Sequence, residues 1–426
     1  MTTQETPSAL TIAPRARRRA IVSSVIGNGL EWFDFGIFSS FSIIISRLMF
    51  PPQSGTAMLM VAFATFGIAF VVRPVGGVLF GMYADRAGRK AALSAIILMM
   101  SAGTLLIGLT PSYATIGVAA SVMIVAARML QGFSAGGEFG TATAFLIETA
   151  PNKKVYYSSW QVASQGASMM LASGFGYFLT TGLSPEALES WGWRVPFFVG
   201  LLIGPVGLYI RARLEETEEF TAAEKEKFPL GTLFKLHYGR LLAGVAVNGV
   251  ATISVYLILF MPTFAVNNLG IPGDAAFLGG IAAGVITLFG VPFVGHLADR
   301  IGPARVMTYA AVAAFVLAYP LFKLMTSTPT VGVMVVVIAL LGVIMSFYFG
   351  PLPALLSGLF PAAIRGSGLS VAYNVGVTLL GGIAPLVLTW LLKATGSLDA
   401  PSIYYMAIAV ISLVGLFFVR KRYAQR

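Results

Sequence analysis

The sequence predicts an all-α membrane protein with twelve transmembrane helices, arranged as two pseudo-symmetric six-helix bundles. Three observations predict this fold class: an apolar composition, apolar runs divided by short polar breaks, and a charged motif that occurs twice, half a chain apart. Of the 426 residues, 57% are hydrophobic and 11% are charged, whereas a soluble domain carries about 25% charged residues. The mean hydropathy of +0.83 agrees. Together these values exclude a water-soluble fold.

Each apolar run is long enough to cross the roughly 30 Å hydrocarbon core of a bilayer as a helix. The breaks between the runs predict helices over residues 20–49, 56–81, 91–110, 116–149, 155–183, 194–213, 240–266, 275–298, 304–325, 331–358, 367–393 and 402–419. A long hydrophilic stretch separates the sixth helix from the seventh. The predicted domains are therefore a cytoplasmic N-terminal segment 1–19, a first bundle 20–213, a cytoplasmic linker 214–239, a second bundle 240–420 and a cytoplasmic tail 421–426.

Basic residues gather at alternate breaks between the predicted helices. If the N-terminus is cytoplasmic, the segments on the opposite side of the membrane keep only Arg47, Arg194, Lys323 and Lys393. The positive-inside rule then predicts that both termini are cytoplasmic.

The composition also argues against several other classes of protein. The net charge of +11 does not indicate a nucleic-acid partner, because the basic residues punctuate apolar runs instead of forming a hydrophilic module. The chain has no cysteine, and its two histidines, His237 and His296, are far apart, so we expect no metal site and no cofactor. An enzyme would need a positioned nucleophile, base or metal, and the sequence shows no pattern of residues that predicts one. A receptor that binds without transporting is disfavoured, because no cytoplasmic output domain is evident.

The repeated motif follows the second predicted helix of each half. It reads Gly81-Met-Tyr-Ala-Asp85-Arg86-Ala-Gly88-Arg89 in the first half and Gly295-His-Leu-Ala-Asp299-Arg300-Ile-Gly302 in the second. A tight turn needs glycine where φ is positive, which is the role predicted for Gly88 and Gly302. Asp85 can meet the positive end of a helix dipole, while Arg86 and Arg89 face an anionic membrane surface. The plainer alternative is a charged loop that only follows the positive-inside rule.

Three further segments accompany this motif: Gly27-Asn-Gly-Leu-Glu31-Trp-Phe-Asp34-Phe, Arg73-Pro-Val-Gly-Gly, and Ala127-Arg128-Met-Leu-Gln131-Gly132-Phe-Ser-Ala-Gly-Gly-Glu138-Phe-Gly. The loop motif resembles the signature of the major facilitator superfamily. The whole set resembles its metabolite:proton symporter family, which includes carriers of citrate, tricarballylate, 2-oxoglutarate, shikimate, and proline or betaine. The second copy departs from the signature, with Pro303-Ala304 where the first copy has Arg89-Lys90.

The resemblance implies a multi-pass carrier of the bacterial inner membrane, in contact with lipids and acting as a monomer. Two similar bundles would open a central site to either side in turn. The repeated loop would then act in gating, and Glu148 resembles the family's helix-four acid that latches against Arg89 when the cytoplasmic side is closed. The predicted gating residues are Gly81, Asp85, Arg86, Gly88, Arg89, Glu148, Asp299 and Arg300.

Ionisable residues within the predicted helices are few, and each costs at least about 2.5 kcal/mol at the centre of a bilayer. Glu31 and Asp34 share one helix face, and Arg73, Arg128 and Glu138 lie in the second and fourth helices. We predict that Asp34, with Glu31 and Glu138, couples transport to protons. Arg128 and Arg73 are predicted to bind a substrate carboxylate bidentately. The alternative is that these residues form permanent ion pairs between the helices.

Polar and aromatic residues inside the apolar runs are weaker candidates for lining the site, because such residues more often join helices to one another. They are Trp32, Gln131, Asn248, Tyr256, Tyr348, Tyr373 and Asn374, with Trp160 and Gln165. The small residues between Ser164 and Gly176 are expected to permit close helix packing.

The leading functional hypothesis is import of a small carboxylate metabolite by proton symport, with citrate-like di- and tricarboxylates favoured. The partners would be an organic anion and protons. One alternative is proton-coupled uptake of a zwitterionic osmolyte such as proline or betaine. Another is efflux by antiport, which is disfavoured because the fifth run lacks the Gly-Pro signature found in the proton antiporters of the superfamily.

Overall fold

The computed structural model describes residues 14–52, 55–148, 151–212, 229–361 and 364–423. Within these ranges the side chains of Asp85, Arg86, Arg89 and Glu148 lie outside the described residues, so their roles in gating stay predictions. The regular elements in the described ranges are all helices, and each of the twelve predicted helix ranges overlaps at least one of them. The all-α fold class is confirmed.

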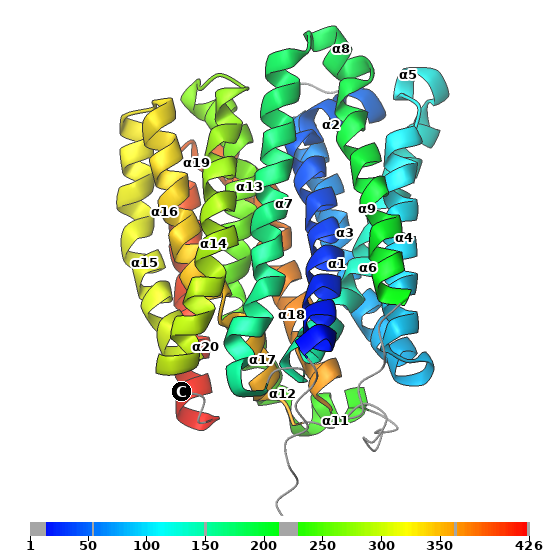
Figure 1. The fold of residues 1–426 in the computed structure, drawn as a ribbon. Helices are drawn as coiled ribbons and strands as arrows, with labels where there is room; N and C mark the ends of the chain where they lie inside the picture. Colours follow the sequence, from blue (N-terminus) through cyan, green and yellow to red (C-terminus); the bar gives the residue numbers. More distant parts are fainter. Residues whose placement is uncertain (1–13, 53–54, 149–150, 213–228, 362–363, 424–426) are drawn as a thin grey trace, which may run out of the picture.

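The first half of the chain forms long helices that run side by side (Figure 1). The first predicted helix begins earlier than expected, at Pro14, and is bent by 67° where α1 meets α2. The elements are α1 (Pro14–Ser40), α2 (Ser42–Met49), α3 (Gly55–Ala87), α4 (Arg89–Leu109), α5 (Tyr113–Ile116), α6 (Val118–Glu148), η1 (Pro151–Lys153), α7 (Lys154–Gly182), α8 (Pro185–Ser190), η2 (Gly192–Arg194) and α9 (Val195–Ala212).

The second half repeats this arrangement after a short helix, α11 (Pro229–Leu236), in the predicted linker. Three of its predicted helices are interrupted: at Asn248, at Gly350-Pro351, and by a π-helical turn, η5. The elements are α12 (Tyr238–Val247), α13 (Gly249–Leu269), η3 (Ala275–Phe277), α14 (Leu278–Ile301), α15 (Pro303–Ser327), α16 (Val331–Phe349), α17 (Leu352–Leu359), α18 (Arg365–Val377), η5 (Thr378–Gly382), α19 (Ala384–Thr395) and α20 (Ala400–Arg422).

Nine helices in the described part of the chain are long and apolar enough to span a membrane, and the bent pair α1/α2 makes a tenth. The other two predicted spans correspond to α7 and α9. The apolar stretch that includes the start of α9 is shorter, Gly192–Leu202. α7 has 29 residues, but serines and glutamines such as Ser158, Gln161 and Gln165 interrupt its apolar sequence.

The two halves contact each other along α7 and α14, where glycines let the helices approach closely. A Cβ added to Gly166 would lie 2.5 Å from the Leu288 nitrogen, and one added to Gly284 would lie 2.5 Å from the Met170 nitrogen. Neither glycine therefore tolerates a side chain without a shift of backbone. This contact confirms the expectation that small residues between 164 and 176 serve close packing.

One end of the molecule carries α11, the start of α1 and the end of α20, and we call it the linker end (Figure 1). Both copies of the repeated motif end in a glycine turn. Gly88, between α3 and α4, has φ 91°, and Gly302, between α14 and α15, has φ 99°. Residues with a side chain rarely adopt these angles, so the predicted role of both glycines is confirmed.

Candidate functional site

The first polar cluster surrounds Asp34 on α1. Its carboxylate accepts hydrogen bonds from the Thr104 hydroxyl on α4 and, at 3.5 Å, from Gln131 Nε2 on α6. Arg128 donates from Nη1 to Gln131 Oε1 at 2.8 Å and from Nη2 to the Phe66 carbonyl oxygen at 3.2 Å. Among the described residues, the fully buried Asp34 and Arg128 are therefore joined through Gln131 instead of by a direct ion pair.

Aromatic rings of the first half enclose the Arg128 guanidinium. Its Cζ lies 4.3 Å from the centroid of Phe38, 4.8 Å from that of Phe35 and 5.4 Å from that of Phe66. A desolvated guanidinium over an aromatic face gains about 2 kcal/mol or more from the ring quadrupole. This aromatic contact partly offsets the loss of water around a charge that has no direct carboxylate partner here.

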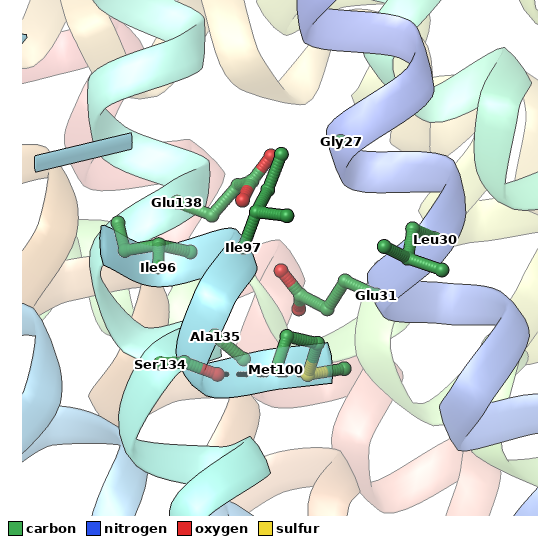
Figure 2. A pocket seen from close by; sticks show the side chains of 9 residues that line it. All are labelled: Gly27, Leu30, Glu31, Ile96, Ile97, Met100, Ser134, Ala135 and Glu138. Carbon is green, nitrogen blue, oxygen red and sulfur yellow. Dashed lines mark hydrogen bonds between the residues drawn. The ribbon is translucent and has the colours of Figure 1, made fainter. Parts of the chain in front are cut away.

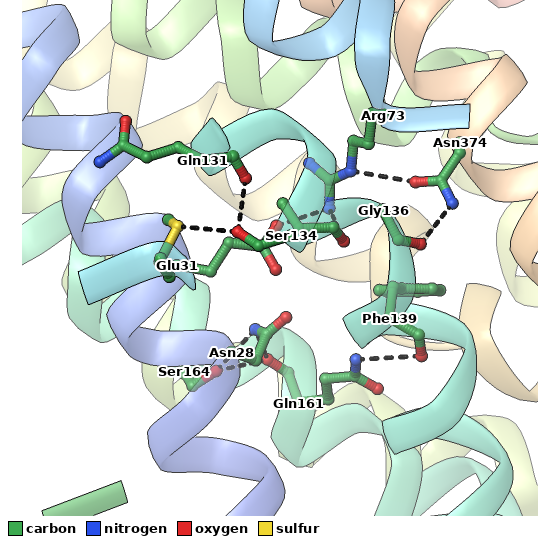
Figure 3. A network of polar contacts seen from close by, with 12 residues as sticks. Asn28, Glu31, Arg73, Gln131, Ser134, Gly136, Phe139, Gln161, Ser164 and Asn374 are labelled. Carbon is green, nitrogen blue, oxygen red and sulfur yellow. Dashed lines mark hydrogen bonds and ion pairs between the residues drawn. The ribbon is translucent and has the colours of Figure 1, made fainter. Parts of the chain in front are cut away.

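The second polar cluster is centred on Arg73 of α3 and includes both halves of the chain. Arg73 Nη2 forms an ion pair with Glu31 Oε1 at 2.5 Å and donates to the Ala135 carbonyl oxygen at 3.4 Å. Its Nε donates to Asn374 Oδ1 on α18 at 3.0 Å (Figure 3). The side chains of Arg73 and Glu31 have exposed fractions of 0% and 4%, and breaking a buried pair of this kind costs about 3–5 kcal/mol.

Aromatic side chains from the second half cover this cluster. The ring of Tyr256 on α13 lies 4.9 Å from that of Phe70 and 6.1 Å from that of Trp32, between centroids. The ring of Tyr373 on α18 stacks on Phe139 of α6. Trp32, Tyr256 and Tyr373 are all buried, so the centre between the halves is closed to solvent in this structure.

Several buried polar atoms near these clusters have no hydrogen-bond partner among the described residues. They are Arg73 Nη1, Arg128 Nε, Trp32 Nε1, the hydroxyls of Tyr256 and Tyr373, and both amide atoms of Gln165. Buried polar groups are nearly always paired, and leaving one unpaired costs about 1–3 kcal/mol. Donors and acceptors of this kind, set among aromatic rings, are what a site for a small polar ligand requires.

A small cavity lies beside the Arg73 cluster, between α1, α4 and α6. The carboxyl groups of Glu31 and Glu138 both point towards it (Figure 2). It has room for about one water molecule. Its other lining residues are mainly apolar: Gly27, Leu30, Ile96, Ile97, Met100, Ser134 and Ala135. Glu31 and Glu138 therefore share one small cavity, and all three predicted proton-coupling residues, Asp34, Glu31 and Glu138, lie within the first bundle.

Two predicted lining residues take part in packing within the second half. Tyr348 on α16 donates to the Val247 carbonyl oxygen at 2.8 Å. Asn248, at the break between α12 and α13, donates to the carbonyl oxygens of Gly244 and Ala372 at 2.8 and 3.2 Å. Both side chains hydrogen-bond helix backbone, as the alternative reading of such residues expects.

Asp299, from the second copy of the repeated motif, joins the two halves at the linker end. Its carboxylate oxygens accept hydrogen bonds from the backbone nitrogens of Val155 and Tyr156, each at 3.0 Å. These nitrogens belong to the first turn of α7, where free N–H groups and the helix dipole favour a carboxylate. Arg300 is exposed beside it, and Gly81 has open space around its Cα.

The sequence analysis did not anticipate two residues of these clusters. Thr104 hydrogen-bonds Asp34 and also donates to the Met100 carbonyl oxygen at 3.0 Å. Thr378 Oγ1 donates to the Phe70 carbonyl oxygen at 2.7 Å, from the second half to the first. A lone threonine in an apolar helix usually bonds the backbone of its own preceding turn, so neither position carries a signal in the sequence.

The fold and the site define a class of protein: a polytopic helical membrane protein whose two halves close over buried charges. A sequence model described as the Major Facilitator Superfamily matches residues 25–385 and also 287–426. A citrate-proton symporter of Klebsiella pneumoniae is 34% identical over 414 residues, which are 96% of this chain and 93% of that protein. A proline/betaine transporter of Salmonella typhimurium is 34% identical over 93% of this chain and 82% of that protein.

Solved structures agree with this assignment of the fold. The xylose transporter XylE from E. coli, in a partially occluded inward open conformation, superposes with a TM-score of 0.71 at 17% identity, over 96% of this chain and 98% of that chain. The chain belongs to the major facilitator superfamily and, within it, to the metabolite:proton symporter family.

Proposed function

We propose that the chain imports a small metabolite bearing a carboxylate group together with protons, by alternating access of one central site. The observation that carries this proposal is the Arg73 cluster, in which a buried guanidinium is shared between Glu31 of the first half and Asn374 of the second. An arginine between two mobile halves, with one unpaired Nη1, suits a substrate carboxylate. The relatives named as symporters and transporters of carboxylate-bearing compounds support it.

The count of buried charges supports proton coupling. The described residues bury two arginines, Arg73 and Arg128, and three acids, Glu31, Asp34 and Glu138. A substrate carboxylate would add a further negative charge in a region where unbalanced charge is costly. A proton that enters with the substrate neutralises one of the acids and keeps the balance. Glu31 would then release Arg73 to the substrate as it takes up the proton.

The contacts of the two arginines differ and support different proposed roles. Arg73 contacts the second half of the chain and is the proposed ligand of the substrate carboxylate. Arg128 is bonded to Gln131 and Phe66 of the first half, close to Asp34, and is proposed to control the proton affinity of that acid. Asp34 and Glu31 are the proposed proton acceptors, with Glu138 beyond the small cavity.

The proposed orientation places the linker end in the cytoplasm of a bacterial cell, with the protein in the inner membrane. The basic residues of the linker and of the end of α20 support it. At the linker end, Asp299 of the second motif copy joins the two halves through the first turn of α7. The repeated loops are accordingly proposed to form the cytoplasmic gate.

A zwitterion is the second candidate substrate, and the aromatic surroundings of Arg73 favour it. Arg73 Cζ lies 5.7 to 6.0 Å from the ring centroids of Trp32, Phe35, Phe70 and Tyr373. Such rings also bind quaternary ammonium groups. A zwitterion or a monocarboxylate adds less charge to this site than a tricarboxylate, so the charge count favours substrates of low net charge over citrate.

The test is uptake by purified protein in proteoliposomes, with an imposed proton gradient that is acid outside. Labelled citrate, 2-oxoglutarate, shikimate and glycine betaine would be compared, each with and without a protonophore. We expect one of the substrates of low net charge to accumulate, and its accumulation to disappear with the gradient. Accumulation that persists after the gradient is collapsed would disprove proton symport, and preference for citrate would disprove the charge argument.

A further inference from the structure

Asn374 on α18 reaches across the boundary between the halves and forms two hydrogen bonds with the first half. Its Oδ1 accepts from Arg73 Nε on α3 at 3.0 Å, and its Nδ2 donates to the Gly136 carbonyl oxygen on α6 at 2.7 Å (Figure 3). The side chain is fully buried. A carboxamide suits this place because it presents an acceptor and a donor side by side on one short planar group.

The first half provides space for this amide with two glycines. A Cβ added to Gly77 on α3 would lie 2.6 Å from Asn374 Nδ2, and one added to Gly136 on α6 would lie 2.6 Å from the Gly77 nitrogen. The backbones of α3 and α6 therefore touch, and the amide of Asn374 rests on the seam between them. A larger residue at Gly77 would push α18 away, and one at Gly136 would push α3 and α6 apart.

Arg73 connects this seam to the proposed proton site. Its Nη2 pairs with Glu31 Oε1 at 2.5 Å while its Nε bonds Asn374. The guanidinium is planar and rigid, so the carboxylate that holds one edge also fixes the direction of Nε. A change of partner at that edge, by protonation of Glu31 or by arrival of a substrate carboxylate, reorients the bond to α18.

We infer that Asn374 is the positioning residue that links the Glu31–Arg73 pair to closure of the two halves. While the pair is intact, α18 is held on α3 and α6. When Glu31 is neutralised or displaced, Arg73 turns away and α18 is released. The inference rests on the proposed function, because it takes Glu31 as a proton acceptor. It adds the contacts through which protonation of Glu31 acts on the second half.

Other charged and titratable groups face Glu31 and must be considered in a test that varies pH. They are Arg73 on α3, Glu138 on α6 across the cavity, Asp34 on α1 itself, Tyr256 on α13 and Tyr373 on α18. Two of these, Glu138 and Asp34, are carboxyl groups like Glu31. A Glu138→Gln variant therefore serves to separate the contribution of Glu138 from that of Glu31.

The chain offers a matched control in Thr378, one turn after Asn374. Its hydroxyl also bonds the first half, to the Phe70 carbonyl oxygen at 2.7 Å, but it has no contact with the Glu31–Arg73 pair. Thr378→Val thus removes a hydrogen bond of the same interface, together with one to the Asn374 backbone carbonyl oxygen, and leaves both hydrogen bonds of the Asn374 amide in place. Because the chain contains no cysteine, spin labels can be placed on introduced cysteines alone.

The experiment measures the distance between labels at Tyr83→Cys on α3 and Gly366→Cys on α18 by double electron–electron resonance, over a range of pH. In the parent chain we expect a closed population at high pH that opens as pH falls. Asn374→Ala should lower the ratio of closed to open molecules about tenfold at high pH and remove the pH dependence. Thr378→Val should lower the ratio less than about tenfold and keep the pH dependence.

Glu31→Gln distinguishes a failure of this inference from a failure of the proposed function. It should give the longer distance between the two labels at every pH, and adding Asn374→Ala should not increase the population with that distance further. If Glu31→Gln removes the pH dependence but Asn374→Ala leaves it intact, the link through Asn374 is wrong and the proton role of Glu31 stands. If Glu31→Gln changes neither the distances nor proton-driven uptake, the role proposed for Glu31 is itself wrong.

Discussion

The two halves of the chain share a fold but not a charge distribution. Arg73 lies eight residues before the first glycine of its motif copy (81 − 73), and the same step in the second copy (295 − 287) leads to Thr287. Both side chains are fully buried. Arg73 pairs with Glu31 and Asn374, whereas Thr287 only donates to the Ala283 carbonyl oxygen of its own helix. At these equivalent positions of the repeated fold, only the first half has a buried charged side chain.

The difference teaches how a two-half site can be assembled. The described residues of the second half bury no charged side chain, but they supply Tyr256, Tyr373 and Asn374 to the first half's clusters. Neutral contacts are made and broken at lower cost than ion pairs. The half without charges is therefore suited to move against a half that retains them.

The largest effect is expected from removing the Arg73 charge of the first half, which has no counterpart at the equivalent position of the second half. Arg73→Ala leaves Glu31 buried without its ion-pair partner, a loss of about 3–5 kcal/mol or at least about a hundredfold. We expect substrate counterflow in proteoliposomes to fall by at least that factor. Thr287→Ala, at the equivalent place, should change counterflow less than about threefold. Equal losses in both variants would show that burial, not charge, distinguishes the two halves.

A second prediction sharpens the contrast between proton and substrate functions within the first half. Asp34→Asn keeps a side chain that can accept from Thr104 but cannot exchange a proton. We expect proton-driven accumulation to fall to simple equilibration, while exchange of labelled for unlabelled substrate continues. Accumulation against a gradient in this variant would remove Asp34 from the coupling role.

A third prediction concerns the contact that the second half makes through its own motif. Asp299→Ala removes the carboxylate that caps α7, and caps of this kind contribute about 1 kcal/mol. The closed state at the linker end should lose roughly fivefold in population, as measured by labels at that end. Arg300→Ala, at an exposed neighbour that does not cap α7, should change the population less than Asp299→Ala does. An equal effect of both variants would indicate a general charge effect.

The smallest effect is expected for Tyr348, which bonds only within the second half. Tyr348→Phe removes its hydrogen bond to Val247, worth about 1 kcal/mol of folding stability. The unfolding temperature should fall slightly while the KM for uptake stays the same. A raised KM would place the Tyr348 hydroxyl at the substrate site after all.

Much of the fold follows from the sequence because its signals are local. Runs of apolar residues set the helices, and the paired motif with Gly88 and Gly302 sets the two turns of positive φ. The breaks within helices were not predicted. The bend at Phe41 and the π-helical turn at Thr378–Gly382 depend on contacts with distant helices, such as that of Gly382 with Phe70.

The sequence predicted which residues belong to the candidate site better than it predicted which of them contact one another. The free-energy cost of placing a charged side chain inside the membrane is enough to select Glu31, Asp34, Arg73 and Arg128 as candidates, since charges are rare at that depth. Which acid meets which arginine is set by helix packing, and Glu31 proves to be the partner of Arg73. Asn374 was one of several polar residues, and only the glycine seam of α3 and α6 distinguishes its place.

The polarity of α7 has a consequence for how the chain enters the membrane. Asn28 of α1 donates to the Gln161 carbonyl oxygen and to Ser164 Oγ, each at 2.8 Å, and the glycines of α14 cover the other side. A helix this rich in serine and glutamine has little tendency to partition into lipid alone. We therefore expect α7 to be retained in the bilayer only as later segments arrive from the ribosome, so that synthesis halted before α14 yields a chain prone to slip back out.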